Sequence, residues 1–195
     1  FANFGFRSYF VDIRRRVVLR LSQDGLTPIS EARMKNFFTD YFQEVIDNNK
    51  HIGSIFRAYG AYDNKFDEYV VCTPTISWNI PGSLNETKPH IEGFAIGFNE
   101  TSKRWNSFYS YQNYITTYNA ELYSFEKGMV YRHNSSNTDY NTFYSIPYPS
   151  RLYIPSNMSP DATKIYNTVA EESTDIWEVE INTRNGQRTT ITTEE

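Results

Sequence analysis

The chain has 195 residues, with 19 Lys and Arg against 23 Asp and Glu and a formal net charge of −4. This length corresponds to one domain or two small ones, and a hydrophobic fraction of 39% is sufficient to fill a core. The acidic balance lacks a concentrated stripe of Lys and Arg. It argues against direct binding of DNA or RNA, because such binding depends on neutralising phosphates. Aromatic residues make up 17% of the chain, and their preference for pleated, half-buried surfaces favours β structure.

The sequence shows no targeting or membrane segment. No apolar run reaches the roughly 18 residues that a membrane span needs, and no secretory signal stands at the start. Cys72 is the only cysteine, so an internal disulfide is excluded, and the Tyr-Val-Val that precedes it predicts a buried strand thiol and not a catalytic one. The chain begins at Phe1 without an initiator Met, and we expect it to be a piece of a longer protein.

The first predicted elements are a β-hairpin and the one clear helix of the chain. The hairpin strands, 8–12 and 17–22, flank a turn rich in arginine. The helix spans 30–47, because its apolar residues recur at the i, i+3, i+4, i+7 spacing of a single face; they are Met34, Phe37, Phe38, Tyr41, Phe42, Val45 and Ile46. Ser30 is the predicted N-cap, and the helix is expected to stop at Asn48 and to pack against the first hairpins.

Three further hairpins follow, with strands at 56–62 and 68–73, 94–98 and 105–111, and 120–125 and 129–133. In each of the first three hairpins of the chain, an aromatic or β-branched strand ends in Asp12, Asp63 or Asn99 before a polar turn. These residues are 51 and 36 positions apart, and the first interval contains the helix. Self-similar antiparallel units of roughly 40 to 50 residues are typical of β-propeller blades. Four hairpins are too few for a closed ring, so we expect an incomplete propeller.

Composition changes after Asn134, where a polar loop precedes segments punctuated by proline. Strands are predicted at 142–146, 151–154, 164–169 and 176–183, and the prolines keep them short or at a sheet edge. The predicted domains are therefore 1–134, which holds the propeller-like hairpins and the helix 30–47, and 135–195, a small antiparallel β unit. The predicted fold class is mainly β, with partial β-propeller-like hairpin repeats, one inserted amphipathic helix and a small all-β unit after them.

The side chains of the last hairpin decide its register. Val179 and Ile181 alternate with glutamates, which gives the strand one apolar and one polar face. A two-residue turn would place Ile191 opposite Glu180 on the charged face, whereas a three-residue loop places it opposite Val179. We therefore predict the three-residue loop, with Gly186 left-handed in a bulge.

No pattern in the sequence assigns a catalytic, cofactor-binding or metal-binding residue, and none is predicted. His51, His90 and His133 have no second ligand at the spacing of a zinc site, and the turn at 63–68 lacks the Gly and alternating oxygens of a calcium loop. The Asp-Gly at 24–25 matches a sialidase Asp box only in part and is interpreted as a simple turn. A nucleophile elbow, a P-loop and a dinucleotide fingerprint are all absent from the sequence.

Two weaker possibilities stay open for carbohydrates. Trp105, Tyr109 and Tyr111 could form a carbohydrate platform, although alternating strand aromatics more often pack in a core. Any two of the 23 acidic residues could meet in space as the carboxylate pair of a glycosidase, and the sequence singles out no pair. The basic clusters at 14–16 and 103–104 lie at hairpin turns, where charge is normally solvated.

Nine short runs carry a family resemblance from the first hairpin to the last: SYFVD at 8–12, VLRLSQDGLTPIS at 18–30, KRWNSFYSY at 103–111, LYSF at 122–125, VYRHN at 130–134, NTFY at 141–144, YPS at 148–150, TKIYN at 163–167 and GQRTTI at 186–191. Together they resemble, in the same order, the large tail muzzle or nozzle proteins of crAss-like and other short-tailed bacteriophages. The resemblance implies a structural subunit at the distal end of a virion tail, where a propeller-like platform surrounds the ejection channel in a ring of identical copies. The family has many hundreds of residues and carries no catalytic residues.

The leading hypothesis is therefore a non-enzymatic component of the virion tail, with copies of itself and other tail proteins as partners and without a cofactor. The alternative is a glycan-binding propeller module at a cell surface, and a sialidase-like hydrolase comes third. Hairpins taken from a larger propeller expose unpaired strand edges, so we expect the isolated chain to associate.

Overall fold

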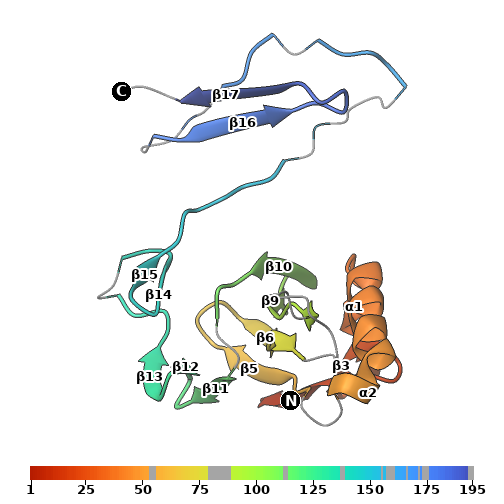
Figure 1. Cartoon of the computed structure of the whole chain (residues 1–195). Helices are drawn as coiled ribbons and strands as arrows, with labels where there is room; N and C mark the ends of the chain where they lie inside the picture. Colours follow the sequence, from red (N-terminus) through yellow and green to blue (C-terminus); the bar gives the residue numbers. More distant parts are fainter. Residues whose placement is uncertain are drawn as a thin grey trace. The chain divides into compact units, whose positions relative to one another are not determined.

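The computed structural model describes residues 1–52, 56–78, 89–111, 114–136, 139–154, 156, 161–165, 167–170, 172 and 176–192. By internal contacts the chain forms two compact units, Phe1–Arg151 and Leu152–Glu195. Strands dominate the described residues, and one long helix lies in the first unit (Figure 1). The prediction of a mainly β fold is confirmed.

The first sheet is an antiparallel meander in the order β1-β2-β3-β4. Its strands are β1 (Ala2–Phe4), β2 (Arg7–Asp12), β3 (Val17–Ser22) and β4 (Gly25–Pro28). The predicted first hairpin is β2–β3, in which Val11 faces Val18. Asp12 closes its turn, since the carboxylate accepts a hydrogen bond from the Arg15 amide at 3.0 Å.

The helix begins later than the sequence predicts. A 3₁₀ turn, η1 (Ile29–Glu31), comes first, and α1 (Lys35–Asp47) and α2 (Asn49–Ile52) follow it. Ser30 is not the N-cap, because its Oγ accepts a hydrogen bond from the Val18 amide of β3 at 3.1 Å. Arg33 has a φ of 65°, which interrupts helical geometry between η1 and α1. The predicted end is confirmed, since Asn48 follows the last residue of α1.

The second sheet joins the second and third predicted hairpins in the order β10-β9-β6-β5. Its strands are β5 (Tyr59–Asp63), β6 (Glu68–Thr73), β9 (Phe94–Asn99) and β10 (Arg104–Phe108). Val71 of β6 faces Ile96 of β9, so these two hairpins form one four-stranded unit and not two separate repeats. A short pair, β7 (Ile76–Ser77) and β8 (His90–Ile91), lies between them in the sequence.

The third sheet contains the fourth predicted hairpin and one strand before it. Its strands are β11 (Tyr114–Tyr118), β12 (Glu121–Glu126) and β13 (Met129–Arg132), and a small hairpin of β14 (Thr142–Phe143) and β15 (Ile146–Pro147) follows. Thr117 of β11 connects this sheet to β5, since its Oγ accepts from the Tyr62 amide at 2.8 Å and donates to the Tyr62 carbonyl at 2.6 Å. The described residues of the first unit thus form neighbouring antiparallel sheets, and they do not close into a propeller.

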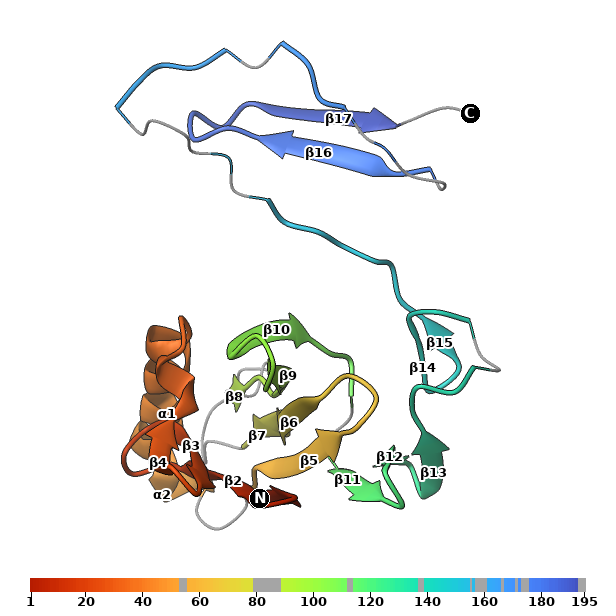
Figure 2. The same cartoon turned by 180° about the vertical axis from the view of Figure 1, so that it is seen from behind.

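Two clusters of buried side chains hold the first unit together. The larger packs the apolar face of α1 against the first two sheets, and Phe38 and Phe42 are fully buried in it. The smaller lies between the second and third sheets. Figures 1 and 2 show α1 on the side of the first unit that is away from β11–β15. The larger cluster therefore attaches α1 to the unit, and the smaller cluster attaches the third sheet on another side. The expected packing of the helix against the first hairpins is confirmed.

Strand β6 belongs to both clusters. All six of its residues are buried. Tyr69 and Val71 contribute to the larger cluster, and Val70 and Cys72 contribute to the smaller one. Cys72 is 1% exposed and its burial raises the pKa of the thiol, so the prediction of a buried strand thiol is confirmed.

The first unit extends to Arg151, beyond the Asn134 at which the sequence composition changes. Aromatic packing accounts for this, because the rings of Phe143 and Tyr111 meet edge to face with their centroids 5.4 Å apart. The predicted strand at 142–146 is instead the hairpin β14–β15.

In the second unit the described residues form one hairpin, β16 (Glu178–Asn182) and β17 (Arg188–Thr192). Its predicted register is confirmed, since Val179 faces Ile191 and Gly186 has a φ of 79°. The Thr183 amide donates to the Gln187 carbonyl at 2.9 Å, which closes the three-residue loop. The strands predicted at 151–154 and 164–169 do not form in the described parts of those segments.

Candidate functional site

A buried carboxylate joins the first two sheets. Glu100 follows β9, and only 3% of it is exposed. Its Oε1 accepts a hydrogen bond from the Tyr9 hydroxyl at 2.8 Å, and its Oε2 accepts one from the Arg20 guanidinium at 2.9 Å. Lys103 forms an ion pair with the same Oε2, and Arg7 Nε lies 3.8 Å from it. Three cations therefore surround one carboxylate.

The ionisation of this cluster follows from its contacts. Burial raises the pKa of Glu100, but hydrogen bonds from Lys103 and Tyr9 and the charge of Arg20 lower it below the ordinary value overall. Burial and the neighbouring carboxylate raise the pKa of Tyr9, so its hydroxyl stays protonated and can donate the hydrogen bond to Glu100. A buried charge is tolerated when it is paired and hydrogen-bonded in this way. The cluster fixes the base of β2, from which Arg7 projects.

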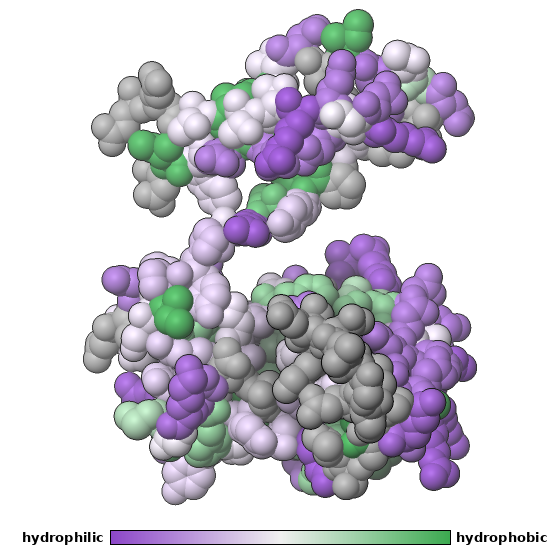
Figure 3. Space-filling view, in the orientation of Figure 1, coloured by the Kyte–Doolittle hydropathy of each residue, from purple (hydrophilic) through white to green (hydrophobic). Residues whose placement is uncertain are grey.

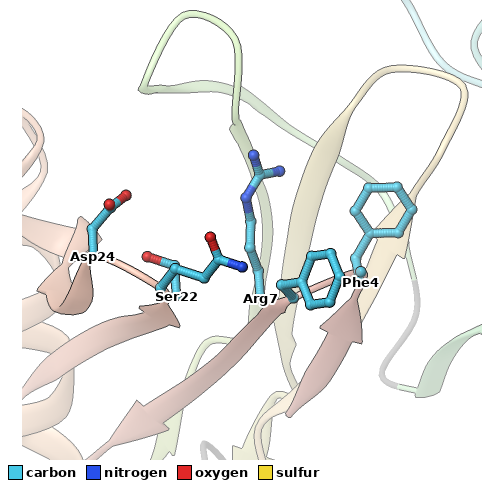
Figure 4. A pocket seen from close by; sticks show the side chains of 7 residues that line it. Phe4, Arg7, Ser22 and Asp24 are labelled. Carbon is cyan, nitrogen blue, oxygen red and sulfur yellow. The ribbon is translucent and has the colours of Figure 1, made fainter.

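A cleft of about 330 Å³ opens beside this cluster, at the end of the first sheet. The turn between β1 and β2 and the turn between β3 and β4 form its walls, and its lining residues are Phe4, Gly5, Phe6, Arg7, Ser22, Gln23 and Asp24. Figure 4 shows the side chains of Arg7 and Asp24 rising on either side of Ser22. Gly5 and Gly25, with φ of 56° and 98°, allow the two turns to be this tight.

The cleft combines aromatic and polar groups that differ in how far other contacts engage them. Phe6 is 85% exposed, whereas the ring of Phe4 stacks on Tyr62 with a centroid separation of 3.8 Å. Ser22 Oγ is buried without a hydrogen-bond partner among the described residues. An unsatisfied buried hydroxyl costs on the order of 1–3 kcal/mol. Asp24 is the one carboxylate among the lining residues, so the lining lacks the carboxylate pair of a glycosidase.

The sequence pattern did not predict this cleft. Its residues come from two turns that are about 17 positions apart, and neither turn carries a chemical motif. The sequence feature that could have indicated the cleft is the Gly5-Phe6 dipeptide, which places an aromatic residue in a turn where polar residues are usual. The Asp-Gly interpretation of 24–25 is consistent with the structure, since Gly25 has a left-handed φ and begins β4.

The three aromatic residues considered as a carbohydrate platform lie in the core instead. The Trp105 indole donates a hydrogen bond to the Ile29 carbonyl at 2.9 Å, and its ring packs on Phe38. Tyr109 donates to the Glu68 carboxylate at 2.5 Å, and Tyr111 is 9% exposed. Trp105 therefore packs against the larger buried cluster, and Tyr109 and Tyr111 pack with the smaller one, so the three rings do not form one exposed surface for sugars.

The titratable residues singled out in the sequence do not meet at a metal site in the described part of the chain. Asp63 acts as a turn residue, accepting hydrogen bonds from the Lys65 amide at 2.9 Å and from the Asn134 side chain at 2.5 Å. Asp67 accepts one from Tyr62 at 2.5 Å. The side chain of His51 lies outside the described residues.

One serine and one histidine do come into hydrogen-bond contact. Ser124 Oγ lies 2.6 Å from His133 Nε2 and 2.7 Å from the Tyr144 hydroxyl. Ser124 is fully buried, so its hydroxyl is not placed to attack a substrate. Burial lowers the pKa of His133 to about 4, and the ring is therefore neutral at physiological pH. The contact fixes the segment after β13 to the third sheet.

Apolar side chains are exposed on the third sheet. Met129 and Val130 of β13 are each 61% exposed, and Phe125 of β12 is 43% exposed. Strand β13 is the last in the order β11-β12-β13, so one edge has no strand partner among the described residues. Figure 3 shows hydrophilic side chains gathered over α1 and less polar ones over β11–β15. This flank has the character of a protein-binding surface.

The second unit is more exposed still. None of its described residues is buried, although it carries many large apolar side chains; they are Leu152, Tyr153, Ile154, Ile165, Val169, Ile176 and Ile191. A single two-stranded hairpin is marginally stable at best in water, because it has no core to bury. The described residues of this unit therefore leave several apolar side chains available for contacts with other protein surfaces.

Comparison with known proteins assigns this part of the chain. Residues 138–195 match the family model of the crassvirus muzzle protein C-terminal domain. Searches of the curated proteins and of the solved structures each gave no match. Among the described helices, none is both long and apolar enough to cross a membrane. The family match agrees with the resemblance seen in the sequence, and it supports a crassvirus muzzle protein, a family of structural components of the virion tail.

Proposed function

We propose that the chain is a non-enzymatic subunit of a muzzle ring, in which identical copies surround the channel through which DNA leaves the virion. The match of residues 138–195 to the muzzle C-terminal domain carries this proposal. A ring requires head-to-tail interfaces, in which one surface of a subunit meets a different surface of the next. The exposed flank of the third sheet and the second unit are the two surfaces that support such an interface.

The second unit favours a role in assembly because it buries little by itself. The apolar face of β16 and β17, formed by Val179, Ile181 and Ile191, is at least partly exposed. Covering that face with another protein surface would supply the apolar burial that a two-stranded sheet lacks, at about 25 cal/mol for each Å². This unit is therefore proposed to become fully stable only within the assembled tail.

Strand β13 favours the same role through its free edge. Unpaired N–H and C=O groups on an edge strand are a template for pairing with another chain. Met129 and Val130 add apolar area beside these groups. An adjacent subunit, or another tail protein, is proposed to cover this strand in the assembled particle.

Sedimentation and electron microscopy test the proposal. The purified chain is expected to associate as its concentration rises, and electron microscopy of purified particles is expected to place it in a tail ring. Val130→Lys should weaken association, because it puts a charge on the proposed interface. Ile46→Lys is the matched control, since Ile46 is 37% exposed on α1, away from the third sheet. A concentration-independent monomer, or equal effects of both variants, would contradict the ring interface.

A further inference from the structure

We propose that the cleft between the β1–β2 and β3–β4 turns binds a neutral saccharide, with one sugar ring resting on Phe6. This inference goes beyond the proposed ring assembly and concerns a different surface from β13 and the second unit. Its basis is the size of the cleft, the polar groups that line it, the exposed phenyl ring and the fixed position of Arg7.

The size of the cleft suits a small ligand. Pockets that hold small molecules have volumes of roughly 300–1,000 Å³, and the cleft, at about 330 Å³, lies at the lower end of that range. Two tight turns form its walls, and both are tied into the same four-stranded sheet. A ligand the size of one or two sugar rings would therefore meet groups from both turns at once.

The polar groups of the cleft match hydroxyls. Arg7 donates only, Asp24 accepts only, and the Gln23 amide does both. Ser22 also lines the cleft, but its Oγ is buried and is not counted among these groups. A sugar hydroxyl can both donate and accept, so a ring with several hydroxyls can bond to all of these groups, whereas an ion would satisfy those of only one kind.

The charges around the cleft favour a neutral ligand over an anionic one. Arg7 is the cation of the lining, but its Nε lies 3.8 Å from the Glu100 carboxylate. Asp24 adds a negative charge on the opposite wall. An anion placed beside Arg7 would therefore face the Asp24 carboxylate across the cleft, and its attraction to the guanidinium would be offset by that repulsion.

Phe6 supplies the apolar part of the site. Its side chain is 85% exposed at a turn, although phenyl rings are normally among the most buried groups. The neighbouring Phe4 is fixed against Tyr62, so the two phenylalanines differ in role. The ring of Phe6 is free to stack against the apolar C–H face of a sugar, and burying both surfaces would favour binding.

Contacts within β1 and β2 hold the first turn of the cleft in place before a ligand binds. Ala2 pairs with Tyr9 across β1 and β2, and the Ser8 hydroxyl donates to the Asn3 side chain at 2.7 Å. Tyr9 in turn donates to Glu100, which holds the base of β2 against the second sheet. A ligand would therefore not have to order the turns that bind it, and less of the contact energy would be lost on binding.

Binding to a printed array of neutral and acidic oligosaccharides, followed by titration calorimetry with the neutral oligosaccharides that bind, tests the site on the full 195-residue chain. The unmodified chain should bind neutral oligosaccharides. Phe6→Ala should weaken binding by at least about tenfold, equivalent to about 1.4 kcal/mol. Asp24→Asn should also weaken it, because the amide presents one acceptor where the carboxylate presents two. Phe66→Ala is the matched control, since Phe66 is 49% exposed on the turn between β5 and β6 and does not line the cleft.

The inference would be overturned by no binding to any neutral oligosaccharide, by binding to acidic ones alone, or by equal losses in Phe6→Ala and Phe66→Ala. Reduced self-association of Phe6→Ala in sedimentation, without any glycan binding by the unmodified chain, would assign the cleft to a neighbouring subunit instead and also overturn it. Circular dichroism of each variant would identify losses caused by misfolding. Val130→Lys separates the two proposals, since it should alter association and leave glycan binding unchanged.

Discussion

Replacing Glu68 with Gln should change how the stability of the first unit depends on pH. Glu68 is 1% exposed, and its carboxylate accepts a hydrogen bond from the Tyr109 hydroxyl at 2.5 Å. Burial raises the pKa of Glu68 from 4.5 to about 6, although the bond from Tyr109 acts in the opposite direction and nearby Asp63 adds to the increase. The folded chain therefore holds this proton more tightly than the unfolded chain does.

The sign and size of the effect follow from this difference. As the pH rises from 4.5 to 6, the unfolded chain releases the proton first, so the free energy of unfolding falls. Each pKa unit is worth about 1.36 kcal/mol, so the charged Glu68 lowers the free energy of unfolding by about 2 kcal/mol above pH 6. Glu68→Gln removes the charge and keeps an oxygen that accepts from Tyr109. Relative to the unmodified chain, the variant should gain up to about 2 kcal/mol between pH 4 and pH 7.5.

Urea unfolding followed by tryptophan fluorescence measures this gain at pH 4, 5, 6 and 7.5. The comparison uses the difference between the two proteins at each pH, so other titrating groups cancel. Glu92→Gln is the matched control, because Glu92 is exposed and the variant makes the same exchange of a carboxylate for an amide at the surface. A difference for Glu68→Gln that is flat with pH would refute the reasoning, because it would mean that Glu68 does not carry its proton differently in the two states.

Two further predictions concern the two buried clusters. Phe38→Ala should lower the free energy of unfolding by about 3–5 kcal/mol, because Phe38 is fully buried at the centre of the larger cluster; a loss below about 0.5 kcal/mol in urea unfolding would contradict the packing of α1 seen here. His133 should make the chain less stable as the pH falls from 6.5 to about 4, because burial keeps the folded ring neutral while His133 of the unfolded chain takes up a proton. The free energy of unfolding should fall by up to about 3 kcal/mol over this range. His133→Gln should flatten that part of the profile, and an unchanged slope in the variant would assign the acid sensitivity to other groups.

The hairpins are the part of the fold that local sequence could predict. Alternating strand residues and polar turns are properties of a few neighbouring positions, and they located β2–β3 and β12–β13 correctly. The register of β16–β17 was also decided locally, because one residue of slip would exchange its apolar and charged faces. In these elements the side chains that set the structure lie within about ten residues of each other.

The features that the sequence did not predict depend on distant residues. The start of α1 was placed too early because the hydroxyl of Ser30 bonds to Val18 in β3 and does not cap the helix. The pairing of β6 with β9 joins two hairpins across the intervening β7 and β8, and no local pattern encodes it. The cleft has the same origin, since Arg7 and Asp24 become neighbours only when two turns of one sheet lie side by side.

The double burial of β6 has a consequence for how the first unit comes apart. Val70 and Val71 are consecutive in the chain, yet they belong to different buried clusters. Withdrawing this strand would therefore expose both clusters at once. The amide protons of β6 should then exchange with solvent only through unfolding of the whole unit. A pulling force applied to either buried cluster would also act on the other through β6, so we expect the three sheets to unfold in a single step.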